Sequence, residues 1–181
     1  MNSITVEKRN PAAKAKQLRR SGIVPCVIYG SSLEESISGQ MGRETARQLL
    51  RKKHEGSTVK IQYEGTTIPG LVKSVDRSVI GDEILHIGFQ ALDAKKSVNS
   101  KARIILENKE KVEGVLEQML FEVQYAALPE DLFDTITIDL SSLSVGTVLT
   151  VEDIPALCEE TIALQTATDN IVLRIGDKKR I

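Results

Sequence analysis

The 181-residue chain has little of the side-chain chemistry on which metal centres and disulfide frameworks depend. It contains two histidines, no tryptophan and only two cysteines, Cys26 and Cys158, which stand far apart in the sequence. No Cys-x-x-Cys or Cys/His spacing of the kind that binds zinc is present. We therefore expect reduced thiols, no metal and no bound cofactor.

Long hydrophobic runs are missing too. A membrane-spanning helix needs about 20 consecutive apolar residues, whereas charged residues make up 27% of this chain and interrupt every apolar run. The N-terminal sequence MNSITVEKRN has no apolar segment after a basic start, as a secretory signal would have. These absences predict a soluble cytoplasmic protein with no membrane partner.

The common catalytic and nucleotide-binding motifs are also absent. The chain has no Gly-x-Gly-x-x-Gly, no Gly-x-x-x-x-Gly-Lys-Ser/Thr and no Gly-x-Ser-x-Gly. His54 follows three cations and is interpreted as a solvated helix end, and Cys26 as a buried strand residue. The acids of Asp82-Glu83 are interpreted as solvated loop charges. We expect no enzymatic activity and no small-molecule substrate, although a hydrolase whose catalytic groups leave no spacing signature stays open.

What the sequence does contain is a strong asymmetry of charge. Residues 1–92 carry 14 Lys and Arg against 9 Asp and Glu, a net charge of +5, whereas residues 93–181 carry 10 against 16, a net charge of −6. We predict two domains with this boundary, a basic one that attracts polyanions and an acidic one that repels them. Two cationic runs supply most of the positive charge, namely Lys8, Arg9, Lys14, Lys16, Arg19 and Arg20, then Arg43, Arg47, Arg51, Lys52 and Lys53.

In the first half, periodicity and turn residues predict short strands and two helices. Asn10-Pro11 opens the first helix, and Glu64-Gly65 joins two strands as a hairpin. In the second helix, Arg43, Arg47 and Arg51 share one face because they are four residues apart. The predicted strands are residues 4–7, 24–29, 57–63, 66–75 and 83–92, and the predicted helices are residues 11–20 and about 43–51.

The second half is predicted to be a compact, mostly β domain. In residues 135–140, isoleucine and leucine alternate with threonine and aspartate, which is typical of a half-buried antiparallel strand. No internal repeat or low-complexity segment is present. The predicted strands are residues 101–107, 121–128, 135–140, 147–151, 161–167 and 170–175.

The first cationic run has two interpretations. In a helix over residues 11–20, Lys16, Arg19 and Arg20 are neighbours, and alanines keep the adjacent surface low enough for a phosphate chain to approach. The alternative is an ordinary solvated helix face with Leu18 turned inward. Tyr29, at the end of the following strand, favours a binding surface if its hydroxyl or ring reaches that face, but it is equally a core tyrosine.

Beyond these patterns, KQLRRSGIVPCVIYG at residues 16–30 resembles the signature of the bacterial 5S-rRNA-binding large-subunit ribosomal protein family. The resemblance is to its long two-domain form, the general stress protein CTC. Three further segments fall in the family's order, so that the resemblance touches both halves of the chain. They are residues 74–89, 113–132 and 136–154.

The resemblance implies a mainly β (α+β) fold with short helices. Its N-terminal β-barrel domain would bind an irregular internal loop of 5S rRNA, and a β-rich C-terminal domain would face outward in the ribosome. It implies RNA contacts at Lys16, Arg19, Tyr29 and His86, and Arg77 matches an arginine of the family pattern. The neighbouring cations Arg9, Lys14 and Arg20 complete the expected RNA-binding set.

The chain departs from the family pattern in three places. The family's Gly-Lys-Gly-Ala run becomes Ala12-Ala13-Lys14-Ala15, Gln17 replaces an arginine, and Gly88 stands where the family has an aspartate that can accept a hydrogen bond from a base. The expected partners are 5S rRNA and the large ribosomal subunit, with neighbouring ribosomal proteins at the acidic domain. The alternative is a stress-response protein of the same fold that acts through a protein partner bound by the acidic domain.

Overall fold

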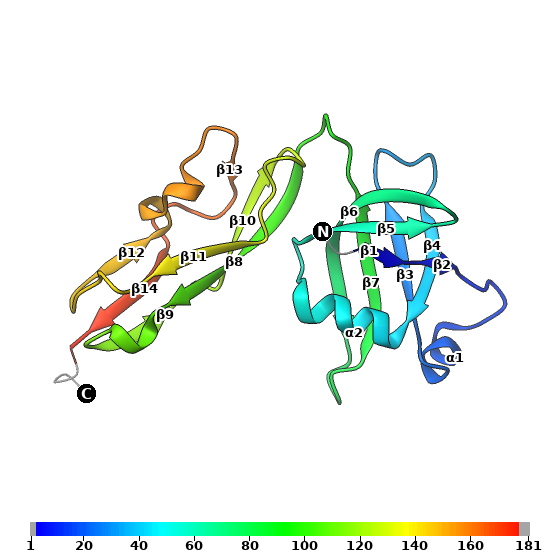
Figure 1. The fold of residues 1–181 in the computed structure, drawn as a ribbon, viewed down its shortest axis with the longest axis horizontal. Coiled ribbons are helices and arrows are strands. Elements are labelled where there is room, and N and C mark those ends of the chain that lie inside the picture. Colours follow the sequence, from blue (N-terminus) through cyan, green and yellow to red (C-terminus); the bar gives the residue numbers. More distant parts are fainter. Residues whose placement is uncertain (1–2, 178–181) are drawn as a thin grey trace. The chain divides into compact units, whose positions relative to one another are not determined.

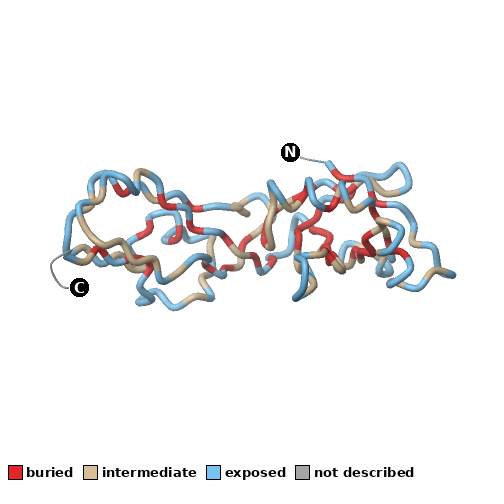
Figure 2. Tube along the Cα trace, turned by 90° about the horizontal axis from the view of Figure 1, so that it is seen from below, coloured by how far each residue is buried: buried red, intermediate tan, exposed pale blue. Residues whose placement is uncertain are grey.

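The computed structural model describes residues 3–177. The chain is mostly β-strand and divides into two compact parts, which we call unit 1 (Met1–Lys96) and unit 2 (Ser97–Ile181) (Figure 1). Each unit has its own hydrophobic core, and Figure 2 shows buried stretches of chain, in red, in both units. The mainly β fold class with two β-rich domains is therefore confirmed. No helix among the described residues is long and apolar enough to cross a membrane.

Unit 1 is a single seven-stranded sheet with two helices. The strands follow the order β1-β5-β6-β7-β3-β4-β2 across the sheet. The elements are β1 (Ser3–Thr5), β2 (Glu7–Lys8), α1 (Ala15–Arg20), β3 (Ile23–Tyr29), β4 (Ile37–Gly42), α2 (Arg43–Lys52), β5 (Thr58–Tyr63), β6 (Thr66–Arg77) and β7 (Ile84–Ala91).

The N-terminal segment turns this sheet into a barrel. Strand β1 pairs with β5 and strand β2 pairs with β4, so that one short stretch of chain bonds to both ends of the strand order. Between the two strands, the backbone N–H of Val6 donates to the carbonyl of Gln62 at 2.9 Å. The sheet edges are thereby covered, which removes the unpaired backbone groups that an open edge exposes.

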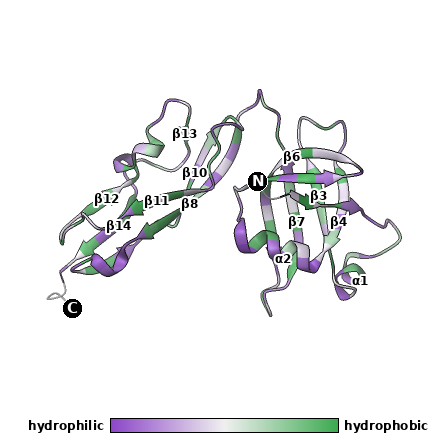
Figure 3. Ribbon diagram, in the orientation of Figure 1, coloured by the Kyte–Doolittle hydropathy of each residue, from purple (hydrophilic) through white to green (hydrophobic). Residues whose placement is uncertain are grey.

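Helix α2 is amphipathic and packs on the barrel. Ala46 and Leu49 are buried, 0% and 3% exposed, and the helix contacts β1, β3, β4 and β7. Arg47 and Arg51 are exposed on the helix, whereas Arg43 at its start is half-buried. Figure 3 shows hydrophilic and hydrophobic stretches alternating along α2. The predicted placement of Arg43, Arg47 and Arg51 on one helical face agrees with the observed helix.

Two features of unit 1 differ from the prediction. Helix α1 begins at Ala15 rather than at Pro11, because the Asn10 side chain accepts a hydrogen bond from the backbone N–H of Ala12 at 3.0 Å and forms a turn. Lys14 occupies the N-cap position with an extended backbone, and it therefore lies outside the helix. Strand β4 was not predicted, because glycines interrupt its hydrophobic pattern.

Unit 2 contains two small sheets. Their orders are β11-β8-β10-β13 and β12-β14-β9. The elements are β8 (Val98–Glu107), η1 (Lys109–Lys111), β9 (Val115–Gln118), β10 (Glu122–Ala127), β11 (Thr135–Asp139), β12 (Val148–Thr150), η2 (Val151–Asp153), η3 (Pro155–Leu157), β13 (Ala163–Leu164) and β14 (Ile171–Gly176), where η marks a 3₁₀ helix.

The predicted antiparallel pairing of β11 is wrong. This strand pairs in parallel with β8, with Ile136 opposite Ile104. Its alternation of buried and exposed residues is as predicted, but alternation reports only that one face is buried. The same pattern fits a parallel strand at the edge of a sheet. Strand β9 was not predicted, and the predicted strand at 161–167 is reduced to the two residues of β13.

Candidate nucleic-acid interface

Helix α1 presents the end of the first cationic run at the surface of unit 1. Leu18 is buried beneath the helix, whereas Lys16 and Arg20 are exposed and Arg19 is half-buried. Arg19 and Arg20 lie in the last turn of the helix, where the carbonyl end of the helix dipole favours positive charge. The helix therefore holds three cations at a surface that a polyanion can approach.

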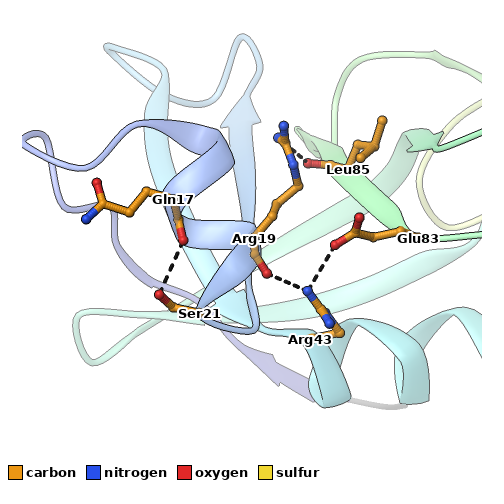
Figure 4. A network of polar contacts seen from close by, with 6 residues as sticks. All are labelled: Gln17, Arg19, Ser21, Arg43, Glu83 and Leu85. Carbon is orange, nitrogen blue, oxygen red and sulfur yellow. Dashed lines mark hydrogen bonds and ion pairs between the residues drawn. The ribbon is translucent and has the colours of Figure 1, made fainter.

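Arg43, the first residue of α2, joins α1 to β7 (Figure 4). Its guanidinium Nη2 donates to the backbone carbonyl of Arg19 and, at 2.9 Å, to Oε1 of Glu83. Its backbone N–H donates to the carbonyl of Gly22 at 2.8 Å. The guanidinium of Arg19 donates in turn to the carbonyl of Leu85 at 3.5 Å. These bonds, which we call the Arg43 clamp, hold the end of α1 against β7.

Asp82 and Glu83 lie in the turn between β6 and β7 with side chains 77% and 43% exposed, as expected of loop charges, and each also bonds to an arginine. Glu83 belongs to the Arg43 clamp, and Oδ1 of Asp82 accepts a hydrogen bond from Nη1 of Arg77 at 2.8 Å. Arg77 therefore braces this turn, and any phosphate must compete with Asp82 for its guanidinium. The hairpin brings Asp82 back to Arg77 at the end of β6, whereas Glu83 bonds to Arg43 of α2.

The outer face of the barrel carries His86 on β7 and Tyr29 on β3. Ile87 and Phe89 are fully buried inside the barrel, so that the alternate residue His86 faces outward. Tyr29 is opposite Gln90, which lies on the same face of β7 four residues beyond His86. About 13 Å along the strand therefore separates the levels of Tyr29 and His86.

Tyr29 stands at the end of β3 remote from α1. Helix α1 leads through Gly22 into Ile23, the first residue of β3, and Tyr29 is the last residue, about 20 Å along the strand. The helix has six residues and is about 9 Å long. The structure therefore associates Tyr29 with the outer sheet face and separates it from the α1 cations.

Two charged residues affect the pKa of His86, Asp76 on β6 and Arg9, which directly follows β2. Asp76 on β6 is opposite His86 in the sheet, with its Oδ2 3.9 Å from Nδ1. Burial lowers the pKa of His86 below its ordinary value, Asp76 raises this pKa, and the positive charge of Arg9 lowers it. The net result is a neutral imidazole at pH 7, with one nitrogen that donates and one that accepts.

Arg9 reaches this face from the end of β2. Its backbone N–H donates to the carbonyl of Ser38 at 3.1 Å, and its side chain is half-buried. Its positive charge lowers the pKa of His86, after the larger effects of burial and of Asp76.

Ser74 limits the space for a side chain at position 88, where the family pattern has an aspartate. Gly88 lies opposite Ser74 in the sheet, and a Cβ atom at position 88 would meet Oγ of Ser74 at 2.6 Å. A larger side chain therefore fits only if Ser74 rotates. Gly88 is itself buried, because the Ser74 side chain covers it.

His54 is not a solvated helix end. Residues 54–57 form a hydrogen-bonded turn after α2, and Nδ1 of His54 lies 2.8 Å from the carbonyl oxygen of Glu55. Its Nε2 is buried and has no hydrogen-bond partner within the described part of the chain. Cys26 is 2% exposed and burial raises its pKa to about 12, which confirms the prediction of an inert buried thiol. Residues 3–177 contain no group of three His, Cys, Asp or Glu side chains arranged to hold a metal.

The predicted RNA-binding residues thus fall into distinct places on unit 1. His86 lies on β7, Arg19 bonds to Leu85 of that strand, Arg9 directly follows β2, and the exposed Lys16 and Arg20 lie on α1. The remaining three are Lys14 before α1, Arg77 at the β6–β7 turn and Tyr29 at the far end of β3. Sequence reasoning missed the joining role of Arg43 and Glu83, because nothing in either local sequence identifies a partner on another element.

Comparison with known proteins accounts for both units. Residues 4–89 match the ribosomal L25p family, and residues 97–179 match the C-terminal domain of ribosomal protein TL5. A Bacillus licheniformis protein named large ribosomal subunit protein bL25 is 30% identical over 160 residues, which covers 86% of this chain and 76% of that protein. The chain belongs to the ribosomal L25p family.

Other relatives align along most of this L25p chain. The bL25 protein of Caldanaerobacter subterraneus is 27% identical over 161 residues, covering 86% of this chain and 81% of the relative. That of Thermoanaerobacter sp. is 25% identical over 181 residues, covering 97% and 89%. The resemblance to the long two-domain form is thereby confirmed. Membership of a ribosomal protein family also confirms that the chain is a non-enzymatic protein.

Proposed function

We propose that this L25p protein binds 5S rRNA through unit 1 as a component of the large subunit of cytoplasmic ribosomes. Support comes from the relatives, which carry the name of a large ribosomal subunit protein. Further support comes from the charge of the first half, because exposed cations are what a protein needs to bind an RNA backbone.

We expect two kinds of contact with RNA, one to phosphates and one to groups that differ between RNAs. Arg9, Lys14, Lys16, Arg19 and Arg20 neutralise phosphates, which position the protein on any RNA. Arg77 joins them if a phosphate displaces Asp82. Tyr29 and the neutral His86 contact groups that differ between RNAs, such as a 2′-hydroxyl or a base edge of an irregular loop.

The observation that carries the proposal is the junction of α1 and β7. The Arg43 clamp fixes the helix that carries three cations to the strand that carries His86. A phosphate-binding element and a neutral hydrogen-bonding side chain are thus held in a fixed relation. Fixed geometry favours recognition of one RNA shape over nonspecific attraction.

Unit 2 is acidic, and we propose that it contacts neighbouring ribosomal proteins rather than RNA. The alternative, a stress-response protein that acts away from the ribosome through a partner of unit 2, is not favoured, because the relatives are named for the large subunit.

A gel-shift titration of the full chain tests the proposal. We expect tighter binding to 5S rRNA than to a transfer RNA at the same concentration, and both affinities should fall steeply as salt rises. Equal affinity for the two RNAs at every salt concentration would contradict specific 5S rRNA binding. Absence of any shift would contradict RNA binding altogether.

A further inference from the structure

The second cationic run lies outside the α1 and β7 site and has no role in it apart from Arg43. Arg47, Arg51 and Lys52 are exposed on α2. No ion pair between described residues involves any of these three side chains. By contrast, the charge of Arg43 is offset by Glu83. Unit 1 therefore presents a second group of cations that residues 3–177 do not pair with a carboxylate.

Beside these cations, a groove runs between α2 and β1, with a volume of about 610 Å³. Buried Ile4 and Leu49 form its apolar lining. Its polar lining consists of side chains that can donate hydrogen bonds, from Ser3, Thr45, Gln48, Arg51 and Lys52.

No residue that lines the groove is acidic. The neighbouring carboxylate is Glu44, whose Oε1 accepts a hydrogen bond from Nε2 of Gln48 at 3.5 Å. One carboxylate beside Arg47, Arg51 and Lys52 leaves a positive local charge. The chemistry of the groove therefore selects an anion.

The arrangement of the cations favours a chain of phosphates over a single compact anion. Arg47 and Arg51 follow the Glu83-paired Arg43 at four-residue intervals, about 6 Å apart along the helix axis, so that two cations without an ion pair continue a row that Arg43 begins. The row begins where α1 ends, because Arg43 bonds to the carbonyls of Arg19 and Gly22. Arg51 lies about 12 Å further along α2. The row thus extends the positive surface of α1 over a new part of unit 1.

The lining also indicates how RNA would be bound. It contains no aromatic side chain on which a base could stack. Arginine, lysine and hydroxyl groups bind phosphate and sugar in any sequence. Contacts at α2 are thus expected to add affinity without adding discrimination between RNAs.

We infer that the exposed face of α2 and its groove bind a second segment of RNA backbone, independently of base sequence. This inference rests on the proposed RNA-binding function and extends it beyond the α1 and β7 site. It assigns Arg47, Arg51 and Lys52 to phosphates, with Ser3, Thr45 and Gln48 as neutral donors.

Charge-removal variants of the full chain test the inference. In the double variant Arg47→Ala/Arg51→Ala, the affinities for 5S rRNA and for transfer RNA should fall by the same factor, roughly tenfold at 0.1 M salt. The salt slope, which is the slope of the logarithm of the binding constant against the logarithm of the salt concentration, should become less steep by about 0.7 to 0.9 for each cation removed. The matched control Lys109→Ala/Lys111→Ala removes two exposed cations from unit 2 and should leave both affinities unchanged. Circular dichroism checks that each variant is folded.

A tethered probe provides a second measurement that keeps both arginines. Because buried Cys26 is unreactive, an iron chelate can be attached to one chosen thiol at a time. The three attachment sites are position 48 in a Gln48→Cys/Cys158→Ser variant, position 17 on α1 in a Gln17→Cys/Cys158→Ser variant, and native Cys158 in unit 2. We expect cleavage of bound 5S rRNA from positions 48 and 17 at different nucleotides, and none from position 158.

The outcomes separate this inference from the proposed function. One outcome overturns RNA binding by α2 and leaves the α1 site intact. In it, the parent chain binds 5S rRNA, the probe cleaves from position 17 but not from position 48, and Arg47→Ala/Arg51→Ala has an unchanged salt slope. Loss of affinity for 5S rRNA alone overturns the sequence independence. Failure of the parent chain to bind any RNA overturns both.

Discussion

Lys16 and His86 illustrate two kinds of residue on one RNA-binding face. Lys16 is exposed on a short helix, and its ammonium group offers a positive charge that every RNA backbone attracts. His86 stands on a rigid barrel strand and is neutral at pH 7, because burial lowers its pKa. A neutral imidazole contributes a directional hydrogen bond and no charge. Substitution of the two residues should therefore affect RNA affinity and RNA specificity differently.

We predict that Tyr29→Phe and His86→Ala each weaken binding of 5S rRNA at pH 7.5 by about 1 to 3 kcal/mol, the usual cost of losing a specific contact. Binding of transfer RNA should stay nearly unchanged. Lys16→Ala should weaken both RNAs and reduce the salt slope by about 0.7 to 0.9. Gel-shift titrations over a range of salt concentrations measure all three variants.

Melting curves serve as the control, because Tyr29 is half-buried and loss of its hydroxyl can also lower the stability of the fold. Tyr29 and His86 variants that stay folded and bind 5S rRNA as the parent does would refute recognition through these positions. Only the electrostatic contribution of the α1 cations to RNA binding would then remain.

At the scale of elements, the Arg43 clamp determines where the α1 cations lie. Glu83 accepts a hydrogen bond from Arg43, which also bonds to the carbonyl of Arg19. The Arg43 and Glu83 side chains are 35% and 43% exposed, so the pair itself contributes about 0 to 1 kcal/mol. We therefore expect the Arg43–Glu83 pair to orient α1 and to contribute little to the stability of the fold.

The sign of one charge change tests this orientation. Removal of a carboxylate near a polyanion normally strengthens binding, but Glu83→Ala should weaken 5S rRNA binding about twofold to fivefold, because it loosens α1. The matched control is Glu44→Ala, an exposed acid of α2 without a bond to α1, which should bind RNA more tightly. Filter binding at low salt measures both. Tighter binding by Glu83→Ala would show that its charge alone matters.

At the scale of the whole molecule, the change from basic to acidic sequence and the boundary between the two hydrophobic cores fall at the same part of the chain. Unit 1 holds the two cationic runs, whereas the second half of the sequence has a net negative charge. Each unit has a hydrophobic core of its own. The two units are therefore expected to fold separately and to differ in their affinity for RNA.

We predict that a fragment of residues 1–96 retains RNA binding with a salt slope close to that of the full chain, and that residues 97–181 bind no RNA. The physical reason is that phosphates are attracted by unit 1 and repelled by the acids of unit 2. Gel shifts of the two fragments measure the affinities, and thermal melts show that both are folded. Strong RNA binding by residues 97–181 would contradict this division.

The sequence by itself determined the features that short windows encode. Alternation and turn residues predicted the hairpin at Glu64-Gly65, now seen between β5 and β6, and the four-residue spacing of Arg43, Arg47 and Arg51 predicted α2. Local hydrogen bonds and side-chain periodicity act over a few residues, and they are therefore legible in the sequence. The family resemblance likewise depended on contiguous runs of residues.

Only the tertiary structure decided which distant residues meet. Strand register places His86 opposite Asp76, and the pairing of β3 with β4 sets Gly42 opposite Ile23, so that Arg43 bonds to both Arg19 and Glu83. A sequence window carries no record of the register between strands, because shifted pairings satisfy local backbone preferences equally well and differ in which side chains are buried. The packing of the whole barrel core selects one pairing, and that selection assembles the candidate RNA-binding surface.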